Sequence, residues 1–408
     1  MTVTVNIEKN IYGGDGLGHL GDGRVIFVPG AFKGDTVKAQ IVKEAKGFVK
    51  ATLVGVDFSP RRDPAQSNVP PQPGMVYASI SPEFESELKR DQLAEFFSRA
   101  RISIPEIETI KTEKSLRYRN KVTYHFSGSK IGYHLPETND IVEFDEDILA
   151  CPEINAAWPG IKQNLLTLLT QGAVAVRRSI AEKRTITIRY TPLSGVKWYL
   201  GGDSGRGGLQ PTPRASADIL KETTLGRTFQ VPLRGFYQVN PEAGEKLVEA
   251  VVREYHRHEE LAPNILDLYC GVGVFGLCCT PPKLTGIESG TEAINFAKQN
   301  ALSTSTPLHG QYKFYAEEVG KNMRKIGIGS QTCVIVDPPR GGLEKGVPEW
   351  LRDSKAPRIF YVSCDPATLM RDLRVITQKY EVERVMWVNM FPRTARFETF
   401  VTLVKTRT

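Results

Sequence analysis

The chain of 408 residues has no Cys-x-x-Cys pair, no long apolar run and no leader-like start. Its six cysteines are scattered, which argues against a zinc site and against a disulfide scaffold. No run reaches the roughly 18 apolar residues that span a bilayer. The first ten residues, MTVTVNIEKN, lack a charged-then-apolar signal pattern. We therefore expect a cytoplasmic protein with reduced thiols and no membrane partner.

The charge balance is modestly positive, with 53 Lys and Arg against 46 Asp and Glu and a net charge of +7. Such an excess fits a polyanionic partner but does not establish one. With 40% hydrophobic residues the chain can form ordinary globular cores, and its length indicates two or three domains.

The N-terminal half predicts two small domains. Residues 3–58 form short strand-like runs separated by glycine-rich turns, which indicates a β-barrel of the OB type. Residues 59–74, rich in proline and polar groups, indicate a linker, and residues 82–100 a helix. Residues 116–230 alternate strand-like runs with one helical stretch near 155–170, which predicts an α+β domain.

From about residue 236 the pattern changes to buried-looking strands that alternate with helices. This alternation predicts a mostly parallel sheet with helices on both faces. The last two strand-like runs, 384–391 and 398–405, are separated by a short loop without a helix. We expect them to pair antiparallel at one edge of the sheet.

A glycine-rich loop, ILDLYCGVGVFG, supplies Gly271, Gly273 and Gly276 between a predicted strand and a predicted helix. That context is the one a nucleotide-binding GxGxxG requires. Glu288 ends the next strand, 21 residues beyond Asp267, where a carboxylate can accept hydrogen bonds from a ribose. The spacing fits NAD and S-adenosylmethionine equally well, and a glycine turn without a ligand is the structural alternative.

Two further strands also end in polar or reactive residues. In the stretch VIVDPPRGG, Asp337 stands at the end of the predicted strand and is followed by two prolines, and Cys364 follows the run RIFYVS. Ligands of open α/β sheets bind at the carboxyl ends of the strands. We therefore expect these residues to share one site, although an isolated cysteine at such a place is more often a buried structural thiol.

Five ordered motifs together resemble the RNA uracil-C5 methyltransferases, which make 5-methyluridine in ribosomal or transfer RNA. The motifs are FYQVN (236–240), DLYCGVG (267–273), DPPRGG (337–342), SCDPATLMRDL (363–373) and MFPRTARFE (390–398). Residues 14–37 look like a TRAM domain, an OB-like RNA-binding module, and residues 118–145 look like the central domain of the family.

The resemblance implies a fold and three domains. These are a TRAM domain over 1–60, a central α+β RNA-binding domain over 75–235, and a Rossmann-like class I methyltransferase domain over 236–408. It also implies S-adenosylmethionine as the cofactor and RNA rather than DNA as the partner. A TRAM domain favours 23S rRNA over tRNA, because some tRNA-specific members lack one.

The resemblance assigns roles to individual residues. Cys364 would be the nucleophile that attacks uracil C6, because a thiolate is both a strong nucleophile and a good leaving group. Glu398 would be the base that removes the C5 proton. The implied cofactor contacts are Gln238, Tyr269, Gly271, Gly273, Glu288, Glu318 and Asp337.

The chain departs from the family at three places. Many members hold a [4Fe–4S] cluster on four cysteines, but residues 59–80 contain none and only Cys151 matches. One thiolate cannot hold such a cluster, so we expect no iron–sulfur cofactor. Asp365 and Arg396 stand where members of the family often have Asn and His. These differences concern how Cys364 and Glu398 are activated, and the two reacting residues themselves are present.

Other activities remain as alternatives. A cytosine-C5 methyltransferase would carry a cysteine after the prolines of DPPRGG, and an amino-group methyltransferase an aromatic where Arg340 stands. An NAD oxidoreductase would leave Cys364 and Glu398 without a role. The remaining alternatives are a tRNA uridine-54 methyltransferase and an RNA-binding protein with a vestigial catalytic domain. In the central domain, Arg117, Arg119 and Lys121 flank Tyr118 and could contact phosphate while Tyr118 stacks on a base, and a charged loop is the alternative.

Overall fold

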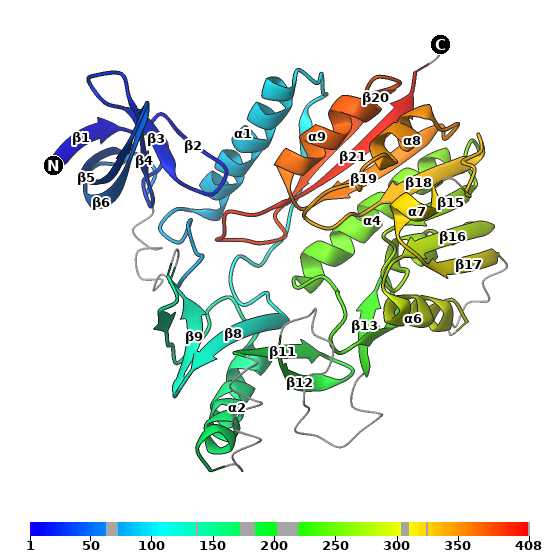
Figure 1. The fold of residues 1–408 in the computed structure, drawn as a ribbon, viewed down its shortest axis with the longest axis horizontal. Coiled ribbons are helices and arrows are strands. Elements are labelled where there is room, and N and C mark those ends of the chain that lie inside the picture. The colour runs from blue at the N-terminus through cyan, green and yellow to red at the C-terminus, as the bar shows by residue number, and fades with distance from the viewer. Residues whose placement is uncertain are drawn as a thin grey trace. The chain divides into compact units, whose positions relative to one another are not determined.

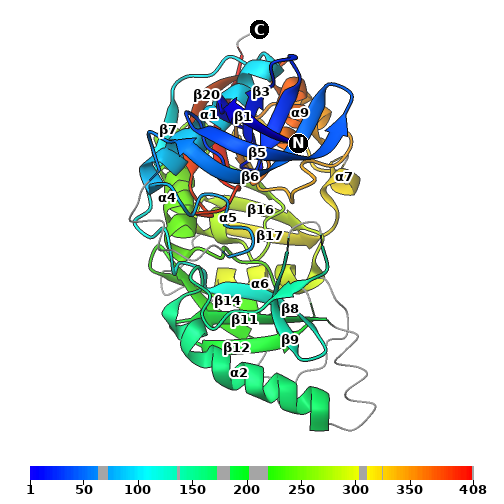
Figure 2. The ribbon, with the colours of Figure 1, turned by 90° about the vertical axis from the view of Figure 1, so that its left-hand side faces the viewer.

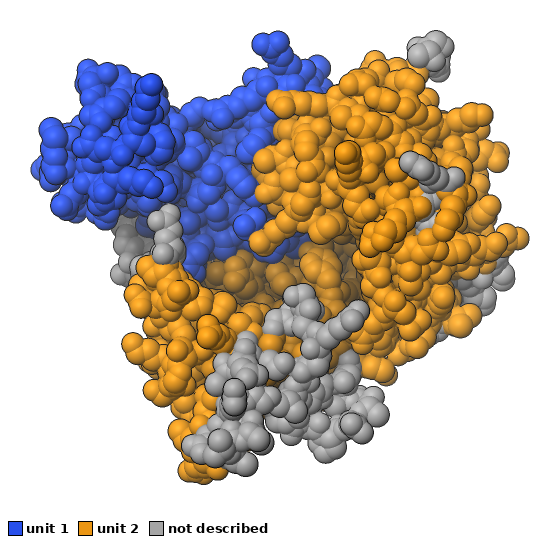
Figure 3. All heavy atoms as spheres, viewed as in Figure 1, with its two compact units in different colours: residues 1–103, 389–398 blue, residues 104–388, 399–408 orange. Residues whose placement is uncertain are grey.

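The computed structural model describes residues 1–62, 72–135, 138–171, 184–201, 219–302, 310–323 and 325–406 (Figure 1). Most of the predicted linker lies outside these residues. Two compact units are coloured in Figure 3. Unit 1 comprises Met1–Ser103 with Asn389–Glu398, and unit 2 comprises Ile104–Val388 with Thr399–Thr408.

Unit 1 opens with a six-stranded sheet whose strand order is β1-β5-β6-β4-β3-β2. The strands are β1 (Thr2–Asn6), β2 (Lys9–Asn10), β3 (Gly16–His19), β4 (Val25–Val28), β5 (Thr36–Ala45) and β6 (Phe48–Phe58). Alternate residues such as Val37 and Ala39 face the core, as the period of a strand requires. The predicted strand-rich N-terminal domain is confirmed.

Helix α1 (Pro82–Ala100) completes unit 1, as the sequence predicts. Ser81 caps it by accepting a hydrogen bond from the Phe84 backbone N–H at 3.2 Å, and Pro82 takes the first helical position. Phe84 and Leu88 bury one face of the helix against Phe32, Tyr77 and Ile80. This apolar contact holds the helix in its unit.

Unit 2 contains an eight-stranded sheet with the order β17-β16-β15-β18-β19-β21-β20-β7. Its strands are β7 (Ile107–Ile110), β15 (Asn264–Leu268), β16 (Lys283–Glu288), β17 (Gln311–Ala316), β18 (Thr332–Val336), β19 (Arg358–Ser363), β20 (Tyr380–Val388) and β21 (Glu398–Lys405). The five strands from β15 to β19 pair in parallel, and β21 pairs antiparallel with β19. The predicted mostly parallel sheet is confirmed.

One part of that prediction is wrong, because the last two strands do not form the edge of the sheet. Strand β7 adds beyond β20, with Val385 paired to Ile107. The Arg384 side chain donates to Glu108 at 2.7 Å and fixes this pairing. The short run IETI, far away in the sequence, gives no signal that it belongs to this sheet.

Helices connect the strands of unit 2. They are α4 (Pro241–His258), α5 (Val274–Cys279), α6 (Thr291–Leu302), α7 (Val319–Asn322), α8 (Val347–Asp353) and α9 (Pro366–Ile376). Helix α4 packs against α5, and α8 packs against α9. Cys278 and Cys279 on α5 are buried core residues, as predicted. Among the helices described, none is long and apolar enough to cross a membrane.

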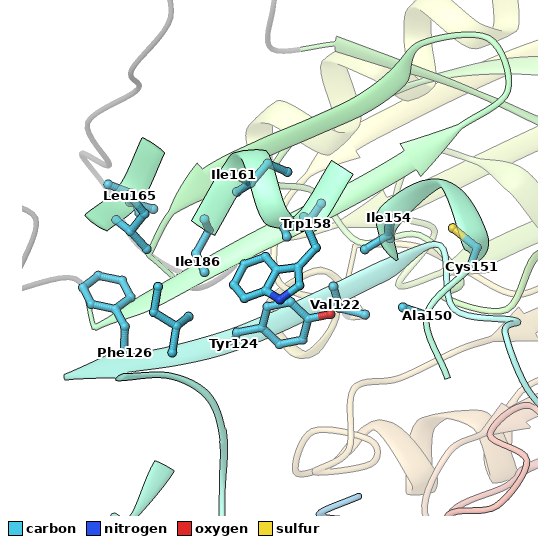
Figure 4. Close-up of a cluster of buried hydrophobic side chains, with 13 residues drawn as sticks. Val122, Tyr124, Phe126, Ala150, Cys151, Ile154, Trp158, Ile161, Leu165 and Ile186 are labelled. Carbon is cyan, nitrogen blue, oxygen red and sulfur yellow. The ribbon is translucent and has the colours of Figure 1, made fainter. Parts of the chain in front are cut away.

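A smaller α+β layer is formed by elements between Lys121 and Leu200 of unit 2. Its sheet has the order β10-β9-β8-β11-β12, with β8 (Lys121–Ser127), β9 (Lys130–His134), β10 (Ile141–Val142), β11 (Thr185–Thr191) and β12 (Gly195–Leu200). Helix α2 (Pro152–Gln171) packs on β11 and β12 (Figure 2). Trp158 of α2 meets the ring of Tyr124 edge-on, with centroids 4.8 Å apart (Figure 4).

Cys151 and Tyr118, two residues that the sequence singles out in this region, are both buried. Cys151 lies in its apolar cluster, and burial raises the thiol pKa to about 11, which suits a structural thiol (Figure 4). Tyr118 is only 3% exposed and its hydroxyl accepts a hydrogen bond from Arg119 at 3.3 Å. A buried ring cannot stack on a base, so that expectation is wrong.

Candidate active site

A pocket opens at the carboxyl ends of β15 and β18 in unit 2. Its walls come from the hairpin of β13 (Ile219–Thr224) and β14 (Arg227–Pro232), the segment before α4, and the loop after β15. The lining residues include Glu222, Thr224, Phe236, Gln238, Val248, Tyr269, Cys270, Gly271, Phe275 and Asp337. Four predicted cofactor residues therefore meet in one pocket: Gln238, Tyr269, Gly271 and Asp337.

The loop after β15 has a conformation that its glycines make possible. Gly273 has a φ of 88° at the N-cap of α5, in the left-handed region that favours glycine. A Cβ on Gly276 would lie 2.6 Å from Leu284 Cδ1 and 3.0 Å from Asp267 Oδ2. The glycine loop thus turns tightly around Asp267.

Asp267 is the buried centre of this turn. Its Oδ2 accepts a hydrogen bond from the Gly276 backbone N–H at 3.0 Å. Its Oδ1 has no hydrogen-bond partner among the described residues. Burial, together with the nearby carboxylates of Asp337 and Glu288, raises its pKa to about 7.

Gln238 is held at the pocket by the residues around it. Tyr237 and Thr224 share a hydrogen bond between their hydroxyls at 2.6 Å, which ties the segment to the β13–β14 hairpin. Asn240 caps α4 by accepting from the Ala243 N–H at 3.2 Å. Gly244 lets the Gln238 side chain lie close to the backbone of α4, since a Cβ on Gly244 would lie 2.8 Å from Gln238 Cβ.

Asp337 reaches the same pocket from the neighbouring strand. Val336 pairs with Leu268 in the parallel ladder, and the Asp337 N–H faces the Leu268 carbonyl at 3.4 Å. Its side chain is half-buried, and the surrounding protein raises its pKa to about 7. The pocket therefore presents a carboxylate, an amide and an approachable backbone beside apolar walls.

Glu288, Glu318 and Gly273 lie at this sheet edge but are not among the lining residues of the pocket. Glu288 ends β16, and its Oε1 accepts from the Gly290 N–H at 2.8 Å. Glu318 stands at the N-cap of α7, where its side chain is 52% exposed and pairs with Lys321 at 2.8 Å. The structure thus places the seven predicted cofactor residues at one edge and only four of them in the pocket.

Cys364 follows β19 directly and precedes α9. Asp365 caps that helix, since its Oδ1 accepts from the backbone N–H groups of Ala367 and Thr368 at 3.0 Å each. Pro366 takes the first helical position. Cys364 is partly exposed, whereas the other five cysteines are buried. The positive end of the helix dipole favours a thiolate at this place.

Glu398 is the first residue of β21 and is 4% exposed. The antiparallel ladder pairs Ser363 with Thr399. Cys364 immediately follows the first residue of that pair, and Glu398 immediately precedes the second. The register therefore brings the two predicted reacting residues to the same end of neighbouring strands.

Some residues of the pocket carry no sequence signal. Glu222 and Thr224 lie on the β13–β14 hairpin, in a stretch that no motif covers. Burial raises the pKa of Glu222 to about 7, although Arg189 pairs with it at 3.3 Å and opposes that rise. Only the packing of the hairpin against the segment before α4 reveals their place.

This fold and site define a class of protein, the S-adenosylmethionine-dependent methyltransferases of the Rossmann-like type. Residues 226–406 match the family described as tRNA (uracil-5-)-methyltransferase, and residues 1–54 match the TRAM domain. Residues 226–406 therefore match the RNA uracil-5 methyltransferase family, as the motifs predict. The protein is thus an RNA methyltransferase that uses S-adenosylmethionine.

Relatives and a solved structure match over nearly the whole chain. An RNA methyltransferase of Thermotoga maritima is 27% identical over 99% of both chains. One from Aquifex aeolicus is 28% identical over 98% of this chain and 97% of its own. The Pyrococcus abyssi tRNA (uracil-54, C5)-methyltransferase in complex with S-adenosyl-L-homocysteine superposes with a TM-score of 0.71 at 21% identity, covering 98% of this chain and 100% of that one. That likeness shows the shared fold.

Proposed function

We propose that the protein methylates C5 of a uridine in 23S rRNA, with Cys364 as nucleophile and Glu398 as base. The observation that carries this proposal is the register of β19 and β21, which joins a partly exposed cysteine and a buried glutamate through the Ser363–Thr399 pair. Both residues come from motifs that characterise the family.

The chemistry follows from what each residue can do. The Cys364 thiolate adds to uracil C6 and pushes electron density onto C5. S-adenosylmethionine supplies the methyl group that C5 then receives. The Glu398 carboxylate removes the proton from C5, and the C6–S bond breaks to release 5-methyluridine and the thiolate. Cys364 is then a thiolate again, Glu398 becomes a carboxylate again once its proton passes to water, and S-adenosylhomocysteine is the co-product.

The pocket supports the assignment of the cofactor contacts. Gln238 and Asp337 offer polar groups that can hold the amino acid or ribose part, and Val248 and Phe275 offer apolar walls. Gly271 leaves the backbone of the loop open to close approach. In the proposal, Glu288, Glu318 and Gly273 contact parts of the ligand that extend beyond this pocket.

The identity of the RNA is the finer part of the proposal. The TRAM match over residues 1–54 supports an RNA partner. It favours rRNA, because some tRNA-specific members of the family lack a TRAM domain. We assign residues 1–60 and 75–235 to RNA binding, and 236–408 to catalysis. The second candidate substrate is uridine 54 of tRNA. The similarity in fold to the Pyrococcus abyssi tRNA (uracil-54, C5)-methyltransferase, which covers 98% of this chain, favours it.

The test uses labelled S-adenosylmethionine with separate transcripts of 23S rRNA and of tRNA. We expect label in the rRNA pool, and nucleoside mass spectrometry should identify it as 5-methyluridine. Label confined to tRNA would select the second candidate. Label recovered as 5-methylcytidine, or no label in either pool, would refute the proposed activity.

A further inference from the structure

The loop Asn389–Glu398 belongs to unit 1. Hydrogen bonds of Arg393, from both its backbone and its side chain, hold this loop against the rest of the unit. The Arg393 N–H donates to Glu85 of α1, with distances of 2.9 Å to Oε1 and 3.1 Å to Oε2. The Arg393 guanidinium donates to the carbonyls of Tyr77 at 3.3 Å and Ile80 at 2.6 Å. In return, the Tyr77 N–H donates to the Arg393 carbonyl at 3.1 Å.

A lysine on the next turn of α1 holds the start of the same loop. Lys89 Nζ lies 2.7 Å from Glu85 Oε1, 2.8 Å from Asn389 Oδ1 and 3.2 Å from the Phe391 carbonyl. The Asn389 amide donates to Glu85 Oε1 at 3.1 Å. Both charged side chains are 0% exposed. One buried ion pair therefore contacts the loop at three of its residues.

Stability alone does not account for this ion pair. The cost of taking two charges out of water can exceed their mutual attraction, and well-packed apolar residues often replace such pairs without loss. What apolar side chains cannot do is bond to backbone N–H and carbonyl groups. Hydrogen bonds to charged groups are short, strong and directional, so the pair fixes where the loop lies.

The stretch from this anchor to Glu398 is short and further restrained. Thr394 Oγ1 donates to the Phe391 carbonyl at 2.9 Å, and the Arg396 N–H donates to Thr394 Oγ1 at 3.4 Å. The Phe397 ring meets the ring of Tyr12 edge-on, with centroids 5.7 Å apart. A displacement at the anchor will therefore pass to Glu398.

We propose that Glu85 and Lys89 are positioning residues for Glu398, so that the TRAM-bearing unit sets the place of the base. This inference rests on the proposed function. Attack and methyl transfer depend on Cys364 and the cofactor, whereas proton removal depends on Glu398. Disturbing the ion pair should slow proton removal from C5 and release of Cys364, while attack and methyl transfer continue.

The test compares two variants of the full-length protein, Lys89→Met and Glu85→Gln/Lys89→Met. In the single variant the Arg393 guanidinium, 3.7 Å from Glu85 Oε2, still faces the Glu85 carboxylate. The double variant removes both charges of the ion pair. We expect the rate of 5-methyluridine release to fall on the order of 10²-fold, as a small misplacement of a reacting group can cause. A methyl-labelled enzyme–RNA adduct that resists SDS should accumulate, with KM for RNA unchanged. A purely structural role would lower activity without this adduct.

Leu88→Ala is the matched control. Leu88 is buried on the same helix and packs in the Phe32–Tyr77 cluster, and its apolar side chain cannot hydrogen-bond to the ion pair or the loop. This variant should have a lower melting temperature. It should still release methylated RNA, and the enzyme–RNA adduct should not accumulate. Equal adduct in Leu88→Ala, or folded Lys89 variants without adduct, would overturn the inference.

Glu398→Gln separates this inference from the proposed function. It should accumulate the same adduct, because its amide cannot accept the C5 proton. If Glu398→Gln accumulates adduct and the Lys89 variants do not, the positioning role falls and the role of the base stands. If Glu398→Gln releases product normally, the proposed role of Glu398 itself is refuted.

Discussion

Ser363 pairs with Thr399 in the antiparallel ladder between β19 and β21, at the last residue of one strand and the second of the other. Ser363 opens the motif SCDPATLMRDL, and Thr399 directly follows the motif MFPRTARFE. Cys364 follows Ser363 and begins the turn into α9. Glu398 precedes Thr399 and is the last residue of the loop of unit 1. A single backbone register thereby relates a candidate nucleophile to a candidate base.

Replacing Cys364 with alanine should abolish both turnover and the covalent RNA adduct. No other side chain described at this sheet edge is a partly exposed thiol. RNA containing 5-fluorouridine should trap the adduct with the unmodified protein, because C5 then carries fluorine in place of the proton that the base must remove before the C6–S bond can break. Gel electrophoresis in SDS measures the trapped complex, and calorimetry should show unchanged binding of S-adenosylhomocysteine.

Cys151→Ala is the control for that experiment. Cys151 is a buried thiol in the α2 cluster, so its loss should leave adduct formation intact. An adduct that persists in Cys364→Ala, or disappears in Cys151→Ala, would contradict the assignment of the nucleophile.

Asp365 should be replaceable by asparagine with little loss of stability, but not by alanine. Either Asp or Asn can cap α9 through the N–H groups of Ala367 and Thr368, whereas alanine loses both bonds, at a cost of about 1 kcal/mol. Asparagine also removes a negative charge next to Cys364. The pH at half-maximal adduct formation should therefore fall in Asp365→Asn, which trapping with 5-fluorouridine RNA can measure. An unchanged midpoint would show that the charge does not influence the thiol.

The sequence predicted the large elements because each was encoded locally. Helix α1 has a capping serine, a proline at its start and an apolar face, and all of these lie within its own residues. The glycine loop and Asp337 follow strands whose buried runs are plain in the sequence. Parallel strands then bring their carboxyl ends together, so the shared edge followed from the predicted sheet.

What the sequence missed was decided by distant packing. The run IETI joins the sheet as β7 only because β20 offers it a free edge. Glu222 enters the pocket only because its hairpin packs beside Gln238. The ion pair of Glu85 and Lys89 looks like an ordinary exposed i,i+4 pair until the loop at residues 389–398 buries it. No local pattern encodes such contacts.

Asp337 should make cofactor affinity depend on pH around neutrality. Its pKa is raised to about 7 by burial, so the carboxylate loses its charge as the pH falls below that value. A ligand that donates hydrogen bonds binds the ionised form better. Calorimetry with S-adenosylhomocysteine should therefore show weakening affinity from pH 8 to pH 6. In Asp337→Asn we expect affinity at pH 8 to be lower by roughly 10–100-fold and nearly flat with pH. A slope equal to that of the unmodified protein would place the titrating group elsewhere.

Asp267 should make the folded state less stable as the pH rises from about 4 to 7. Burial raises its pKa to about 7, against an ordinary value near 4. In that window the folded chain keeps a proton that the unfolded chain has released, so the free energy of unfolding falls as pH rises, by a few kcal/mol in total. Asp267→Asn keeps an acceptor for the Gly276 N–H and cannot ionise. Urea unfolding at pH 5 and pH 7.5 should show a smaller loss of stability in this variant.

The surface variant Asp57→Asn serves as the reference for that measurement. Asp57 is an exposed carboxylate of unit 1 that pairs with Lys38 at 3.3 Å. Its replacement removes one negative charge without touching the glycine loop, so the loss of stability between the two pH values should match that of the unmodified protein. If Asp267→Asn shows the same loss as Asp57→Asn, Asp267 is ionised in the folded state throughout this range. The tight turn would then carry a buried negative charge.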